Sequence, residues 1–418
     1  MIPGEPSVGE LMSEYQVLTV LAAFAFFYSV VASRLERTPI SGPVVYLFVG
    51  LACGTYGLGL VDLDVDREMM KRLAEYTLAL VLFADSANAN LGTLRKVEQI
   101  PVRLLLIGLP LTIAAGVVTG YFIFDSLTLL EVALLATMLA PTDAALGQAV
   151  VTNESVPDSV RESLNVESGL NDGICVPVLL IFLALAIGDA GGDETTSLIL
   201  TLPLEEIGIG AGVGVILALV GSSLVTFCAA RGWISGAWTR IPVITLAMFC
   251  FALSQWLGGS GFIGAFVGGL LFGGLIKNHE VKEELLAGAE GVGNLMSLLT
   301  WFVFGALAFG KGLQDVSWPV ILYAVLSLTI VRMLPVMLCL VGIKARLDSK
   351  MFLGWFGPRG LASIVFIVIV LGENLPGADT LAAVVTWTVV LSVIAHGVSA
   401  VPLANKYAKR VADREGVV

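Results

Sequence analysis

The sequence predicts an all-α polytopic membrane protein with about thirteen transmembrane helices. Of its 418 residues, 57% are hydrophobic and 14% are charged, whereas a soluble domain usually carries about 25% charged residues. The mean hydropathy is +0.91, which leaves little sequence for a soluble domain. Apolar stretches of the roughly 20 residues that a helix needs to cross a bilayer recur along the whole chain.

Thirteen apolar windows account for the candidate spans. They fall at 14–33, 39–60, 73–91, 102–124, 129–150, 160–187, 204–230, 238–257, 259–277, 290–310, 318–342, 352–372 and 380–404. Only the short break at 258–260 separates spans eight and nine. We expect two six-helix repeats of opposite orientation at 1–187 and 238–404, a linking helix at 188–237 and a short cytoplasmic tail at 405–418.

Loop charges orient these spans, because Lys and Arg mark the cytoplasmic side. Basic residues follow spans one, three, seven, eleven and thirteen: Arg34 and Arg37; Arg95, Lys96 and Arg103; Arg231 and Arg240; Lys344, Arg346 and Lys350; Lys406, Lys409, Arg410 and Arg414. Acids follow spans four, six and twelve: Asp125; Asp189, Asp193 and Glu194; Glu373 and Asp379. We therefore expect a multi-pass protein of the cell (inner) membrane, with its N-terminus outside and its C-terminus in the cytoplasm. The acidic N-terminus lacks the basic start of a signal peptide, so the first span is expected to remain in the protein as a membrane helix.

Composition argues against several classes of protein. The five cysteines occur singly and there are only two histidines, so neither disulfides nor a zinc site are expected. A net charge of -11 is not typical of a protein that binds nucleic acid, and no Walker A or G-x-G-x-x-G sequence suggests that the chain binds a nucleotide. We expect no cofactor and no enzyme activity.

Span five contains TMLAPTDAALG, which places a carboxylate at a break. A charge at the bilayer centre costs at least ~2.5–3.5 kcal/mol, so such residues mark ion paths or internal ion pairs. Pro141 disrupts the helix, and Thr142 and Asp143 follow at once. A broken helix is tolerated at membrane depth only where it lines a cavity, and freed carbonyls beside a carboxylate suit a cation. The alternative is a kinked helix with Asp143 at the interface.

Span six contains NVESGLNDG, with two acids in an apolar segment. Ser168 and Asp172 are four residues apart and share a helix face, as do Glu167 and Asn171. Glu167 and Asp172 point about 140° away from each other. One acid can therefore face an ion cavity while the other pairs with a basic residue; the alternative is a structural polar cluster that includes both.

Two arginines in the second half are candidate partners, Arg332 in span eleven and Arg359 in span twelve. A buried arginine needs an acid or helix-end carbonyls; the alternative for Arg359 is snorkelling to the interface. Gly357, Pro358 and Gly360 break span twelve. Breaks at matched positions of two repeats are the best sequence indication of a transporter's central site.

Three weaker features remain open. Asp85 in span three either flanks a cation route or bonds within its own polar cluster of Ser86, Asn88 and Asn90. His396 is expected to be hydrogen-bonded packing rather than a proton relay. Residues 279–284 (HEVKEE) are expected to form a solvated loop, with pH sensing by His279 as the alternative.

Together, PTD at 141–143, NVESGLND at 165–172, Arg332 and GPRG at 357–360 resemble the cation/proton antiporter-1 family, the NhaP-type sodium/proton antiporters related to mammalian sodium/proton exchangers. The resemblance covers the full chain. It implies a thirteen-helix inverted-repeat fold in which helices five and twelve are unwound and cross. It also implies a homodimer in the lipid bilayer that exchanges one monovalent cation for one proton.

Site residues carry over from the resemblance by position. Asp172 is implied to bind the cation and the proton, with Asn171 where electrogenic relatives have a second Asp. Thr142, Asp143 and Ser168 complete the site, and Glu167 matches the acid that pairs with a basic residue of helix eleven, here Arg332. Three departures are Ala144, where the family often has Pro, Gly173, which is expected to loosen the helix, and Asp85, which only approximates the family's acidic position. The tail after Lys406 is expected to be too short for a nucleotide-sensing domain.

The expected function is an electroneutral antiport by alternating access, in which a cation and H+ compete for Asp172. Na+ is the first expectation, and Li+ and K+ are the alternatives. A second class is a cation-coupled symporter of an organic solute, which would need a larger cavity with aromatic groups, as Trp355 and Phe356 could supply. A channel would need rings or repeated filters, and a membrane scaffold would not explain so many buried charges.

Overall fold

The computed structural model describes residues 8–35, 41–61, 67–89, 99–143, 146–151, 153, 155–191, 196–309, 316–343, 345–373 and 375–415. Residues outside these ranges include Arg37, Asn90, Arg95, Lys96, Ala144, Asp193, Glu194 and Lys344, which are named above. Within the ranges every regular element is a helix. A helix satisfies its own backbone hydrogen bonds, which is what a segment in lipid requires.

The first half of the chain forms the following helical segments: α1 (Val8–Leu35), α2 (Gly42–Cys53), α3 (Arg67–Asn88), α5 (Ile100–Arg103), the π-helical turn η1 (Leu104–Gly108), α6 (Leu109–Ile123), α7 (Leu129–Met138), α8 (Gln148–Val151), α9 (Asp158–Gly191) and α10 (Thr196–Ala230). The second half forms the 3₁₀ turn η2 (Gly236–Arg240), α11 (Ile241–Trp256), α12 (Gly261–Leu275), α13 (His279–Phe304), the π-helical turn η3 (Gly305–Phe309), α15 (Trp318–Leu328), α16 (Ile330–Cys339), α17 (Leu347–Trp355), α18 (Leu361–Leu371) and α19 (Ala378–Glu415).

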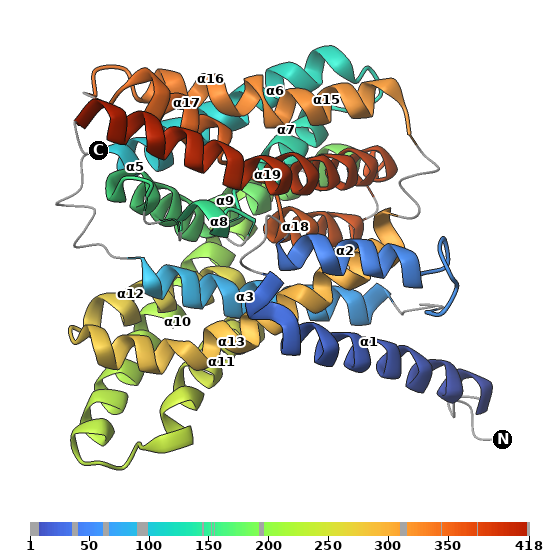
Figure 1. The fold of residues 1–418 in the computed structure, drawn as a ribbon. Coiled ribbons are helices and arrows are strands. Elements are labelled where there is room, and N and C mark those ends of the chain that lie inside the picture. The colour runs from blue at the N-terminus through green and yellow to red at the C-terminus, as the bar shows by residue number, and fades with distance from the viewer. Residues whose placement is uncertain are drawn as a thin grey trace.

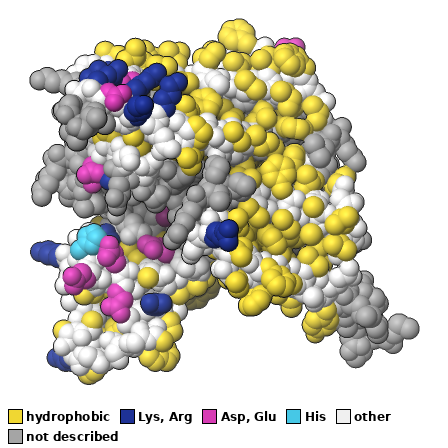
Figure 2. All heavy atoms as spheres, in the orientation of Figure 1, with side chains coloured by type: hydrophobic (Ala, Val, Ile, Leu, Met, Phe, Trp, Pro, Cys, Tyr) yellow, Lys and Arg dark blue, Asp and Glu magenta, His cyan; other side chains and the backbone are white. Residues whose placement is uncertain are grey.

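The chain is a multi-pass membrane protein. Within the described ranges, eight helical segments are long and apolar enough to span a bilayer, and α2, α7, α12 and α18 are shorter apolar helices. Hydrophobic side chains cover much of the right half of the face in Figure 2, and most of the charged side chains lie in its left half. Each of the thirteen predicted windows contains at least one helix; that all thirteen cross the membrane stays a prediction.

Spans eight and nine are separate helices, as predicted. α11 ends at Trp256 and α12 begins at Gly261. Gly258 adopts a φ of 77° in the turn between them, a conformation that favours glycine. The hydroxyl of Ser260 accepts a hydrogen bond from the backbone N–H of Ile263 at 3.5 Å, so this side chain caps the start of α12.

Two local predictions are wrong. Residues 279–284 are not a loop, because α13 already begins at His279, where the Asn278 side chain accepts from the N–H of Val281 at 3.3 Å and caps the helix. Gly173 does not loosen its helix, because α9 runs unbroken from Asp158 to Gly191. A Cβ at Gly173 would instead overlap the ring of Phe266, so the glycine serves a close helix contact.

The helices group into two bundles (Figure 1). One bundle contains α5–α9 and α15–α19, and the other contains α1–α3 and α10–α13. The bundles meet where α9 and α18 contact α3, and where α9 also contacts α10 and α12. The broken helices α7 and α17–α18 therefore lie in the same bundle, next to α9.

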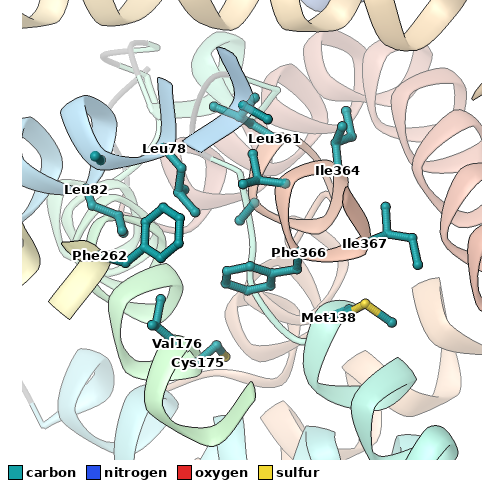
Figure 3. Close-up of a cluster of buried hydrophobic side chains, with 14 of the residues drawn as sticks. Leu78, Leu82, Met138, Cys175, Val176, Phe262, Leu361, Ile364, Phe366 and Ile367 are labelled. Atoms are coloured by element: carbon teal, nitrogen blue, oxygen red, sulfur yellow. The ribbon is translucent and has the colours of Figure 1, made fainter. Parts of the chain in front are cut away.

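An apolar core fills the junction between the bundles (Figure 3). Leu78 and Leu82 of α3 and Phe262 of α12 lie on one side of it, and Cys175 and Val176 of α9 lie on the other. Four side chains of α18 complete this part of the core: Leu361, Ile364, Phe366 and Ile367. The polar groups of α7, α9 and α18 are thus bordered by tightly packed apolar side chains, which limit the routes by which water can reach them.

Candidate functional site

Span five is interrupted directly after α7. Residues 139–143 have no helical structure, and α8 begins only at Gln148. The carbonyls of this stretch are used by side chains of other helices: Ser363 donates to the Met138 carbonyl at 2.7 Å, and Ser168 donates to that of Thr142. The carbonyls of Met138 and Thr142 are therefore already hydrogen-bonded, which leaves side-chain oxygens as the more available ligands.

Arg359 occupies the same interruption. Its Nη1 donates to the carbonyls of Ala140 at 2.7 Å and Pro141 at 3.0 Å, and its side chain is fully buried. The alternative of a snorkelling Arg359 is wrong. The arginine instead donates hydrogen bonds to backbone carbonyls that lost their helical partners at the break. Carbonyls at a helix end require such partners.

Span twelve is interrupted between α17 and α18, and the two interruptions touch. The N–H of Asp143 donates to the Pro358 carbonyl at 2.8 Å. Oδ2 of Asp143 accepts from the N–H of Leu361, the first residue of α18, at 2.9 Å. Asp143 thereby caps α18, where a helix N-terminus favours negative charge.

Glycines allow this close approach. A Cβ at Gly360 would overlap the carboxylate of Asp143, and a Cβ at Gly357 would overlap the guanidinium of Arg332. The GPRG sequence therefore supplies two positions without side chains where polar groups of other helices pass, and the arginine that fills the break in span five.

One face of α9 closes the site opposite the break in span five. Nδ2 of Asn171 donates to Oγ1 of Thr142 at 2.7 Å, and Ser168 lies one turn earlier on the same face. Within the described chain, Oδ1 of Asn171 and Oδ1 of Asp172 are buried without a hydrogen-bond partner. Asp172 is 9% exposed. Buried acceptors of this kind call for an unseen proton, water or cation.

Glu167 faces away from this site and binds Arg332. Its two oxygens accept from Nη1 and Nη2 of Arg332 at 2.6 and 2.8 Å, and both side chains are 2% exposed. Arg332 also donates to the Leu353 carbonyl at 3.5 Å. The pair ties α9 to α16 and to α17, so the two acids of span six have different surroundings.

A cavity of about 250 Å³ opens beside the site. Asp85 and Gly169 lie in its wall, and its other lining residues are Asn88, Ala89, Asn165, His279, Lys282 and Glu283. Gly169 is one helical turn before Asp172 and packs against Asp85, because a Cβ at Gly169 would lie 3.3 Å from the backbone oxygen of Asp85. Charged side chains of both signs and a histidine share the left end of the molecule in Figure 2. The cavity is a candidate route from that end.

Several polar residues around the site were not anticipated. Glu290 of α13 accepts from Nδ2 of Asn88 at 2.6 Å, Lys282 lines the cavity, and Ser363 holds the broken helix. Ser392 accepts from the N–H of Arg359 at 2.6 Å. Only Glu290, an acid inside a helical segment, carried a signal that sequence reasoning could have used.

The remaining candidate residues, His396, Trp355 and Phe356, make structural contacts. Both ring nitrogens of buried His396 are within hydrogen-bond distance of backbone carbonyls, those of Ser392 and Trp355, at 2.9 Å each. Trp355 donates through its indole to Ser399 at 3.0 Å, and Phe356 packs against Phe352. Neither Trp355 nor Phe356 is among the described residues that line the cavity. The aromatic groups that a symporter of an organic solute would need therefore do not lie at this cavity.

Comparisons with known proteins agree with this arrangement. Residues 20–406 match the family model described as "Sodium/hydrogen exchanger, transmembrane". A K+/H+ antiporter NhaP2 of Shewanella sp. (strain MR-4) is 25% identical over 388 residues, which are 93% of this chain and 66% of the relative. A K+/H+ antiporter NhaP of Alkalimonas amylolytica is 23% identical over 93% of this chain and 66% of its own length.

The fold has a counterpart among solved structures. The sodium proton antiporter MjNhaP1 from Methanocaldococcus jannaschii, solved at pH 8, matches with a TM-score of 0.75 and 20% identity, over 92% of this chain and 99% of that one. The chain spans just under two thirds of the length of the two curated relatives above. Because the family model covers residues 20–406, the chain belongs to the sodium/hydrogen exchanger family, whose members are transporters rather than enzymes.

Proposed function

We propose that this protein exchanges a monovalent cation for H+ across the cell membrane, with both ions competing for Asp172. The observation that carries the proposal is the pair of buried oxygens on Asn171 and Asp172 that have no hydrogen-bond partner among the residues the structure describes. They lie on the α9 face that binds Thr142. An ionised Asp172 there needs a cation, and a protonated one needs none, so one ligand excludes the other.

The ligand set that we propose combines Asp172 and the Asn171 oxygen with Oγ1 of Thr142 and, through electrostatics, Asp143. Ser168 holds the Thr142 carbonyl and so fixes the wall of the site. Hard oxygen ligands suit an alkali cation. Na+ is our first choice of cargo, in line with the name of the M. jannaschii neighbour, and K+ is the competing choice, in line with the names of the curated relatives.

Competition at a single carboxylate couples the two fluxes. A bare buried carboxylate is costly in a low-dielectric region, so the transporting bundle crosses its barrier only when Asp172 holds a proton or a cation. Asn171 contributes no second charge. One positive charge then moves in each direction, and the exchange is electroneutral. Glu167 and Arg332 form an ion pair with each other, so neither adds a net charge to the exchange.

We propose further that the chain is an inverted repeat with thirteen spans, an external N-terminus and a cytoplasmic C-terminus, and that it forms a homodimer. Spans four to six share a bundle with spans eleven to thirteen, and spans one to three share the other with eight to ten. Corresponding spans of the two repeats thus fall in the same bundle, which supports the repeat boundaries at 1–187 and 238–404.

Purified protein in proteoliposomes tests the proposal. A pH-sensitive dye should report proton release when Na+, Li+ or K+ is added to one side, and the order of half-maximal concentrations gives the cation preference. Electrical recording on supported membranes should show no transport current. No cation-dependent proton movement would overturn antiport, and a current that scales with exchange would overturn the one-for-one stoichiometry.

A further inference from the structure

Glu131 is a buried acid in the first turn of α7 that the ion-exchange site does not use. It is 2% exposed. Its Oε2 accepts from the N–H and the hydroxyl of Thr128, at 2.9 and 3.1 Å. Its own N–H donates to the Thr128 hydroxyl at 3.2 Å. These bonds form a capping box, which satisfies backbone donors at a helix start.

The other carboxylate oxygen leaves α7 altogether. Oε1 accepts from the N–H of Gly377 at 2.6 Å, and Gly377 directly precedes α19. The contact is tight, because a Cβ at Gly377 would overlap Leu127 and lie 2.8 Å from Oε1 of Glu131. The start of α7 is therefore fastened to the start of α19, although 246 residues separate Glu131 from Gly377.

The far end of α7 is fastened to the same half of the chain. Ser363 of α18 holds the Met138 carbonyl at 2.7 Å, and Asp143 caps α18 through Leu361 at 2.9 Å. α18 runs antiparallel to α7, because its first residues meet the end of α7 and the turn after it meets the start. Two carboxylates of span five thus each bind the N–H at the start of a helix of the second half.

α7 is a short helix that connects the contacts at its start with those at its end. A ten-residue helix is about 15 Å long and every residue from Glu131 to Met138 is buried. A displacement by a single residue, about 1.5 Å along the axis, would break the hydrogen bonds at the far end. The axial position of α7 at its start therefore sets where Thr142 and Asp143 lie.

We propose that Glu131 is a positioning residue for the ion-exchange site: through Gly377 it fixes the axial position of α7 and so places Thr142 and Asp143 opposite Asn171 and Asp172. The inference rests on the proposed antiport. It assigns the contact with Gly377 to cation affinity and the contact with Thr128 to helix stability, and these two roles can be separated by substitution.

Three variants in proteoliposomes separate them. Glu131→Asp can still cap its own helix but is too short to reach Gly377. Glu131→Gln keeps one oxygen that can accept from Gly377. Thr128→Ala removes the hydroxyl of the capping box and leaves the contact with Gly377 in place. For each variant the half-maximal cation concentration and the maximal exchange rate are measured with the pH-sensitive dye, and the melting temperature is measured in detergent.

Glu131→Asp should raise the half-maximal cation concentration about tenfold, the effect of losing one hydrogen bond to a charged group (~1.4 kcal/mol), and change the maximal rate by less than about twofold. Glu131→Gln should lie between Asp and wild type. Thr128→Ala should lower the melting temperature and leave the half-maximal concentration unchanged. A wild-type value for Glu131→Asp, or an equal increase for Thr128→Ala, would overturn the positioning role.

Hydrogen exchange supplies a readout that does not depend on transport. The Gly377 amide should exchange slowly in wild type and in Thr128→Ala, and faster in Glu131→Asp; equal protection in all three would also overturn the proposal. If Glu131→Asp does not fold, the comparison of Glu131→Gln with Thr128→Ala carries the test. Failure of the antiport itself appears separately, as wild-type protein without exchange.

Discussion

Glu167→Ala removes one partner of an ion pair in which both side chains are 2% exposed. Two hydrogen bonds to charged groups are lost, at 2.6 and 2.8 Å. Arg332 then keeps only the Leu353 carbonyl at 3.5 Å within the described chain, while its charge stays buried. Breaking a buried pair in this way costs about 3–5 kcal/mol.

The assay is thermal unfolding in detergent, followed by size-exclusion fluorescence. For a chain of this length the loss corresponds to a fall of roughly 5 °C in melting temperature. Asp158→Ala is the matched control on the same helix. It removes the acid from the pair with Arg161, in which the Asp158 side chain is 79% exposed, so it should cost less than about 1 kcal/mol.

A double variant tests the cause of the loss. Glu167→Leu with Arg332→Met replaces the pair by apolar side chains of similar volume, and such replacements are often neutral or stabilising. The double variant should therefore melt well above Glu167→Ala. The reasoning is refuted if Glu167→Ala melts like wild type, or if the double variant is as unstable as the single one.

Three further predictions concern the site and the C-terminal end of the chain. Asp172→Asn should abolish cation-for-proton exchange while the protein keeps its melting profile; retained exchange in the dye assay would remove Asp172 from its role. Gly360→Ala should slow exchange at least about tenfold, because its Cβ overlaps the carboxylate beside it, whereas Gly274→Ala, with nothing within 4 Å of its Cβ, should exchange at the wild-type rate. Burial alone would raise the pKa of Asp348, but the hydrogen bond and charge of Arg414 outweigh it and lower that pKa. The stabilisation is therefore present at neutral pH and lost as pH falls through the lowered pKa. Asp348→Asn should cost less than about 1 kcal/mol at pH 7, because Arg414 is 45% exposed. The melting curves of variant and wild type should begin to converge near about pH 4 and coincide once the pH is below the lowered pKa. A difference that grows in acid would contradict this sign.

Hydropathy located the described helical regions but misplaced the helix ends that extend beyond the apolar windows. α13 starts eleven residues before its predicted window, at His279, because Asn278 caps a charged first turn. α19 continues past the predicted end to Glu415, where Arg414 binds Asp348. An apolar window reports only the part of a helix that faces lipid or core, so capped and ion-paired extensions are invisible to it.

The cost of buried charge identified the two stretches that meet at the site, because few structures tolerate acids and a break at membrane depth. It could not choose between Arg332 and Arg359 as the partner of Glu167, since each arginine satisfied the same rule. The choice depends on how α9, α16 and α17 pack. Glu131 was not among the predicted site residues. A Thr-x-x-Glu spacing is typical of a capping box, but it gives no indication of the bond to Gly377, which lies 246 residues away.

The guanidinium of Arg359 lies inside the interruption of span five, bonded to the carbonyls of Ala140 and Pro141. This positive charge belongs to the protein itself and stays at the break. The two ends of the interrupted helix are therefore held in place without a bound cation. In the proposed exchange, the site can therefore keep its geometry between the departure of one ion and the arrival of the other.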